Sequence, residues 1–89
     1  MKINLIFYAV LEETISAEPL LLEVKNGSTA EQVVALLSEK YPQAAAILRS
    51  TRLAHQDEYV GKKSVLTDGE VYCLIPPVSG GEFFLNCSQ

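Results

Sequence analysis

The sequence has one histidine, two cysteines, no tryptophan and only seven lysines and arginines in 89 residues. One histidine and two cysteines do not make a metal site, and two cysteines are too few for a disulfide framework. The seven cations are scattered and the net charge is −4, which argues against nucleic acid as a partner. No apolar run approaches the roughly 20 residues that cross a bilayer, so we expect no membrane partner either.

The residues that are abundant favour a small folded domain. A hydrophobic content of 48% with 20% charge predicts a globular chain rather than disorder. A chain of this length forms one domain and buries roughly 60–65% of its unfolded surface. Met1 and Lys2 lead directly into a strand pattern with no secretory cleavage signal. We therefore expect a soluble, cytoplasmic protein.

The pattern along the chain predicts an α+β fold. Ser28 and Glu31 predict a capping box at the start of the main helix, and Pro42 predicts its end. Thr67-Asp68-Gly69 predicts a turn before the last strand. The expected elements are strands at 3–10 and 18–24, a loop at 11–17, a helix at 29–41, a helical turn at 43–48, and strands at 49–55, 58–60 and 70–75.

This order is that of a ubiquitin-like β-grasp domain, with a mixed sheet of four to five strands packed on one main helix. The first and last strands are expected to pair in parallel at the centre of the sheet, because a helix-bearing crossover connects them. We expect residues 1–77 to form this domain, residues 78–81 a flexible arm, and residues 82–89 a C-terminal extension.

The chain offers little of its own for catalysis. The segment from His55 to Glu58 could be drawn as an acid–base group, but a solvated polar loop is the expected reading. Ser79 has no partner base nearby in the sequence, and no glycine-rich phosphate loop is present. We expect a protein that catalyses nothing by itself and binds no cofactor.

The strongest functional signal is the segment after the last strand. Two prolines stiffen the chain, Val78 offers one apolar anchor, and the glycines carry no side chain that would clash in a narrow channel. Such an arm can carry a slim backbone terminus into the active site of another protein. The arm consists of Pro76, Pro77, Val78, Ser79, Gly80 and Gly81.

Two motifs resemble the MoaD family, the small, sulfur-carrying subunit of molybdopterin synthase. They are Leu66-Thr67-Asp68-Gly69-Glu70-Val71 and Ile75-Pro76-Pro77-Val78-Ser79-Gly80-Gly81. Phe7-Tyr8-Ala9 and Gln56-Asp57-Glu58-Tyr59-Val60 are also similar to that family, so the resemblance covers about residues 1–81.

The resemblance implies a sulfur carrier in molybdenum cofactor biosynthesis. A MoeB-like E1 enzyme would adenylate the Gly81 carboxylate with ATP, and a sulfur donor would convert it to a thiocarboxylate. The arm would then enter a MoaE-like large subunit, in a heterotetramer, and pass sulfur to cyclic pyranopterin monophosphate. Catalytic residues would belong to the large subunit, and sulfur would travel on Gly81 rather than on Cys73 or Cys87.

The resemblance also implies an apolar partner surface to which Tyr8, Tyr59 and Ile75 would contribute. The alternative is that Ile75 belongs to the core and that Tyr8 is an ordinary residue of the sheet surface.

The chain departs from the family after Gly81, because Glu82 to Gln89 follow and turn its carbonyl into an amide. An amide cannot be adenylated as a carboxylate can. The extension could be a propeptide removed by a protease, an expression remnant or read-through, or the mark of a protein that has left the sulfur cycle. Two other functions therefore stay open: a sulfur carrier for thiamine or tRNA thiolation, and a ubiquitin-like interaction module that is never sulfurated.

Overall fold

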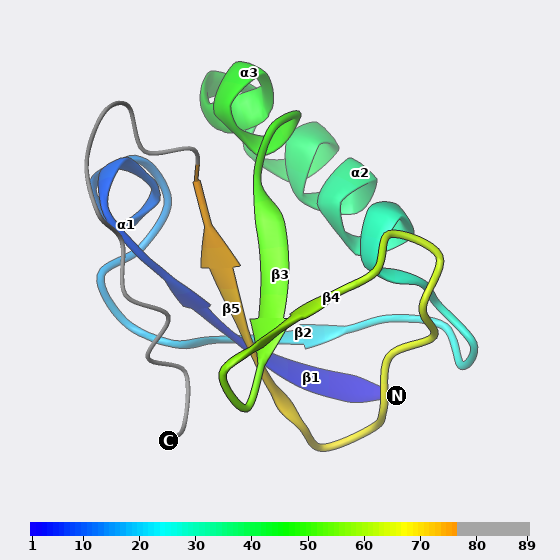
Figure 1. Cartoon of the computed structure of the whole chain (residues 1–89). Coiled ribbons are helices and arrows are strands. Elements are labelled where there is room, and N and C mark those ends of the chain that lie inside the picture. The colour runs from blue at the N-terminus through cyan, green and yellow to red at the C-terminus, as the bar shows by residue number, and fades with distance from the viewer. Residues whose placement is uncertain (77–89) are drawn as a thin grey trace.

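The computed structural model of the chain describes residues 1–76, in which five strands form one sheet (Figure 1). The predictions for Pro77 to Gly81 and for residues 82–89 concern residues outside the described part of the chain. The elements are β1 (Lys2–Phe7), α1 (Val10–Thr14), β2 (Leu20–Glu23), α2 (Ala30–Lys40), the 3-10 turn η1 (Pro42–Ala44), α3 (Ala45–Leu48), β3 (Arg52–His55), β4 (Glu58–Val60) and β5 (Val71–Ile75).

The strand order β2-β1-β5-β3-β4 confirms the ubiquitin-like β-grasp prediction. Strands β1 and β5 pair in parallel near the centre, with Leu5 opposite Tyr72. Strands β2 and β3 each pair antiparallel with one of these two, and β4 lies antiparallel at the edge. Figure 1 shows α2 across one face of the sheet, with α3 continuing beyond its end.

The main core lies between α2 and the sheet. One stripe of α2, made of Ala30, Val33 and Leu37, is buried as its spacing predicts. Opposite it, β1 buries every second residue, as a strand with one face on the core should. Burying a leucine completely contributes about 1.5–3 kcal/mol relative to leaving it in water. The fully buried leucines of this layer are Leu5, Leu11, Leu37, Leu48, Leu53 and Leu74.

The first strand is shorter than predicted. It ends at Phe7, and the chain turns at Ala9, whose φ is 54°, into α1, where a strand end and a loop were expected. The amide of Leu11 donates to the carbonyl of Tyr8 at 3.1 Å, and the Leu11 side chain is fully buried. The helical turn forms because it places Leu11 in the core, which a continued strand would not do.

The helix cap lies one residue later than predicted. Thr29 is the N-cap, its hydroxyl accepts from the Gln32 amide at 3.4 Å, and the Gln32 side chain accepts from the Thr29 amide at 2.9 Å. Ser28 instead donates its hydroxyl to the carbonyl of Lys25 at 2.7 Å. The bridge between Thr29 and Val65 holds Thr29 in extended backbone. This tertiary contact selects the cap, which the Ser28–Glu31 spacing could not reveal.

The predicted turn before the last strand is confirmed. Gly69 has a φ of 82°, and its amide donates to the carbonyl of Lys2 at 2.7 Å. Asp68 accepts from the Lys2 amide at 2.6 Å. These two bonds attach the turn to the start of β1 and so help set the register of β5 beside it.

In the part of the chain that the structure describes, none of the helices has the length and apolar character needed to cross a membrane.

Candidate functional site

The one histidine is paired, but not in a catalytic arrangement. The Nε2 atom of His55 lies 2.6 Å from Oε1 of Glu70, and its ring centre lies 5.1 Å from that of Tyr72. His55 ends β3 and Glu58 begins β4, as the expected strands place them, and the two residues between them form an exposed turn. Both partners of the His55–Glu70 pair are partly exposed, and they join the end of β3 to the residue before β5. This position suits a structural contact between neighbouring strands.

Metal-ligating side chains do not gather in the described part of the chain. Within residues 1–76, no group of three or more histidine, cysteine, aspartate and glutamate side chains could hold a metal ion.

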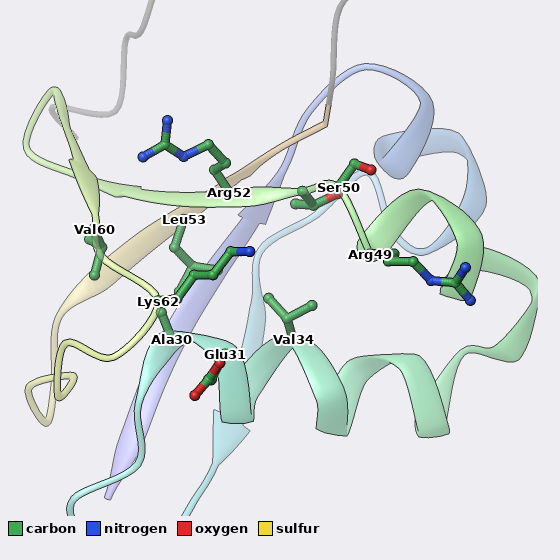
Figure 2. Close-up of a pocket in the computed structure, with 10 residues that line it drawn as sticks. Ala30, Glu31, Val34, Arg49, Ser50, Arg52, Leu53, Val60 and Lys62 are labelled. Atoms are coloured by element: carbon green, nitrogen blue, oxygen red, sulfur yellow. The ribbon is translucent and has the colours of Figure 1, made fainter.

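One cleft of about 380 Å³ opens on the helix side of the sheet (Figure 2). Its walls combine apolar residues of α2, β3 and β4 with cationic and polar residues of the connecting segments. Among these walls, the Thr51 hydroxyl donates to the carbonyl of Ile47 at 2.8 Å. The residues that line it are Ala30, Glu31, Val34, Arg49, Ser50, Thr51, Arg52, Leu53, Val60 and Lys62.

The other side of the sheet, which we call the second face, carries a separate apolar cluster. Its buried members are Ala54, Cys73 and Ile75, and Ile6 and Tyr8 pack against them. Strand β5 is therefore buried on both faces, with Tyr72 and Leu74 in the main core. Neither side of β5 is a solvent-facing side, because the strand lies between β1 and β3 in the sheet.

The predicted interface residues share this second face. Tyr8 and Ile75 belong to the cluster, and Tyr59 is the cross-strand partner of Ala54, which places its side chain on the same face. Their exposures differ: Tyr59 is 47% exposed, Tyr8 is half-buried and Ile75 is only 5% exposed. Their role in binding a partner stays a prediction.

The base of the arm lies at one end of this face. Strand β5 ends at Ile75, followed by the buried Pro76. Ile75 pairs with Arg52 on one side, and on the other side Leu74 pairs with Phe7, the residue before Tyr8. The chain therefore leaves the sheet between Arg52 and Tyr8.

Sequence reasoning did not single out Arg52. Its guanidinium carbon lies 4.1 Å from the centre of the Tyr59 ring. The signal available in the sequence was weak: an arginine in a short apolar strand, with a tyrosine seven positions later. Only the pairing of β3 with β4 brings the two together.

Comparison with known proteins gives a consistent result. The model of the ThiS family matches residues 5–81. Curated relatives named molybdopterin synthase sulfur carrier subunit occur in several organisms. That of Aedes aegypti is 30% identical in an alignment of 88 positions, gaps included, which covers 91% of this chain and 90% of that protein.

Several solved structures are also similar to this chain. One, titled a protein-protein complex of subunits 1 and 2 of molybdopterin-converting factor from Helicobacter pylori, is similar with a TM-score of 0.65 and 27% identity. The match covers 91% of this chain and 100% of that one. A ubiquitin from Caldiarchaeum subterraneum matches with a TM-score of 0.62 and 22% identity, over 91% of this chain and 98% of that chain, which shows the shared fold.

Proposed function

Since the chain belongs to the ThiS family, we propose that it is a sulfur carrier in molybdenum cofactor biosynthesis. Gly81, once it ends the chain, is the group that carries sulfur. The observation that carries this proposal is the extent of the family match, which runs through the whole arm and stops at Gly81. The name shared by the curated relatives favours this cofactor over thiamine or tRNA thiolation.

The chemistry requires activation of a carboxylate. A carboxylate is a poor acyl electrophile until one oxygen becomes part of a better leaving group. Transfer of AMP from ATP to the Gly81 carboxylate provides that group, and a sulfur nucleophile then displaces AMP to leave a thiocarboxylate. Delivery of the sulfur to cyclic pyranopterin monophosphate returns the carboxylate. The carrier itself binds no cofactor, because ATP is used by the activating enzyme.

The partners follow from these steps. A MoeB-like E1 enzyme adenylates Gly81, a separate donor supplies sulfur, and a MoaE-like large subunit provides the catalytic residues and forms a heterotetramer with the carrier. The curated relatives are named as sulfur carrier subunits, which supports a non-catalytic carrier. The Helicobacter pylori complex supports a large-subunit partner.

Each segment of the chain has its own role in the proposed cycle. Residues 1–77 form the body that partners recognise through the second face, including Tyr8, Tyr59 and Ile75. Residues Pro76 to Gly80 place the terminus, and Gly81 carries the sulfur. Residues 82–89 must be removed before loading, because the amide between Gly81 and Glu82 leaves no carboxylate to adenylate.

Intact mass spectrometry tests the proposal directly. The chain ending at Gly81 is incubated with a MoeB-like enzyme, ATP and a sulfur donor. We expect a mass increase equal to the replacement of one oxygen by sulfur. Addition of the large subunit and cyclic pyranopterin monophosphate should then return the carrier to its original mass and form the dithiolene product.

Two control chains make the result specific. The full chain of 89 residues and a chain ending at Gly80 should both keep their original mass. The proposal is wrong if the chain ending at Gly81 gains no sulfur while an established carrier does so in the same mixture. A loaded chain that transfers no sulfur to the pterin would instead support one of the other carrier functions.

A further inference from the structure

Arg52 is an exposed cation at the arm end of the second face. The guanidinium of Arg52 lies 4.1 Å from the centre of the Tyr59 ring, within the range of a cation–π contact. Figure 2 shows this guanidinium on the opposite side of β3 from Leu53 and Val34. Arg52 thus points away from the helix-side cleft, although part of the residue lines it.

The charge of Arg52 is not neutralised within the described chain. The ion pair present among residues 1–76 is that of His55 with Glu70, and it does not involve Arg52. A cation–π contact at an exposed site contributes about 0.5–1 kcal/mol, which restrains a side chain without removing its charge. Guanidinium keeps donors that can bind a carboxylate in a two-pronged geometry. Arg52 is therefore ordered and still available to a negatively charged group.

The position of Arg52 connects it to the arm. Its cross-strand partner is Ile75, the last residue of β5, and beside it lie the apolar Ala54 and Cys73 of the second face. A partner that receives the arm must approach this end of the sheet. Charged groups at the edge of an apolar contact fix orientation and register more than they add affinity. In a chain with a net charge of −4, a local cation also selects a partner surface of opposite sign.

We propose that Arg52, held on the Tyr59 ring, binds a carboxylate of the large subunit and so orients that partner around the base of the arm. The inference rests on the proposed function, because it takes the large subunit as the occupant of the second face. The similarity to one half of a two-subunit complex supports this choice of occupant.

Binding of the full chain to the large subunit from its own organism tests the role of Arg52. Isothermal titration calorimetry at low and high salt is carried out on the natural sequence, Arg52→Ala, Arg52→Lys and Arg49→Ala. We expect Arg52→Ala to weaken binding roughly tenfold or more at low salt. The affinity of Arg52→Lys should lie between those of the natural sequence and Arg52→Ala, since lysine keeps the charge but lacks the planar donor pair.

Arg49→Ala is the matched control. Arg49 is also exposed and three residues away, but Figure 2 shows it beside α3, away from Arg52. Its removal changes the net charge equally and should alter the dissociation constant less than about twofold. Circular dichroism of each variant shows whether the fold is kept, and Arg52→Lys still tests the pair geometry if Arg52→Ala is unstable.

A second measurement identifies the opposing group. Arg52→Glu should abolish binding, and reversing the charge of one acidic residue of the large subunit should restore it at least in part. Equal effects of Arg52→Ala and Arg49→Ala would overturn the inference while leaving the sulfur carrier function intact. The inference would also be overturned if Arg52→Ala weakened binding to the activating enzyme, or weakened self-association, but left binding to the large subunit unchanged. If neither the full chain nor the chain ending at Gly81 binds the large subunit, the proposed function itself fails.

Discussion

The backbone conformation of Gly69 could be predicted from the sequence. Its φ of 82° lies in the left-handed region, and apart from its own chain neighbours no atom lies within 4 Å of the position that a Cβ would take. The cost of a side chain here is therefore conformational rather than steric. Thr67-Asp68-Gly69 predicted this turn, because glycine adopts positive φ without penalty. The positive φ of Ala9 had no such signal and follows from the burial of Leu11 beside it.

Replacing Gly69 by alanine should lower the free energy of unfolding by about 1–2 kcal/mol, which is the cost of left-handed backbone for an L-residue. Gly27, with a φ of 87°, should respond in the same way. Gly61→Ala is the control: its Cβ would meet the flexible Ser64 side chain at 3.1 Å, and the change should stay within about 0.5 kcal/mol. Urea unfolding followed by circular dichroism measures all three, and equal losses at Gly61 and Gly69 would contradict the conformational explanation.

At the scale of elements, local patterns identified the helix and most of the strands but not their ends. The buried stripe of α2 and the parallel pairing of β1 with β5 follow from periodicity and connection rules. The cap of α2 does not, because Ser28 and Thr29 are both acceptable cap residues. The contact between Thr29 and Val65, which are distant in the sequence, decides between them.

Thr29→Ala should destabilise the protein by about 1 kcal/mol, since it removes the hydroxyl that caps the amide of Gln32. Ser28→Ala should cost clearly less, because its hydroxyl binds a turn carbonyl and leaves the helix amides unchanged. Thermal or urea unfolding of the two variants measures the difference. If Ser28→Ala lowered the stability more than Thr29→Ala, Ser28 would be the cap residue, as the sequence pattern predicted.

At the scale of the whole molecule, the sheet joins all parts of the described chain. The two central strands come from opposite ends of it, and α2 packs on the layer that they form. Neither the N-terminal pair of strands nor the C-terminal strands can bury this core alone. A small domain of this kind should unfold in one cooperative step.

Urea unfolding should therefore give the same midpoint by far-ultraviolet circular dichroism and by tyrosine fluorescence. The absence of tryptophan leaves tyrosine as the fluorophore, and the buried Tyr72 reports on the main core. Two separate midpoints, or an intermediate seen by one probe, would show that part of the sheet unfolds independently.

The sequence by itself determined the fold class, the main helix and the turn at Gly69, while the arm up to Gly81 stays a prediction. These features depend on residue type and spacing within short segments, where glycine, proline and apolar periodicity act directly on the backbone. It also pointed to Tyr8, Tyr59 and Ile75, although their binding role stays a prediction.

Only the tertiary structure decided where β1 ends, which residue caps α2, and that β5 is buried on both faces. It alone placed Arg52 on Tyr59 beside the base of the arm. The physical reason is common to all four: each depends on a contact between segments that local preference leaves unspecified, and the packing of the sheet makes the choice.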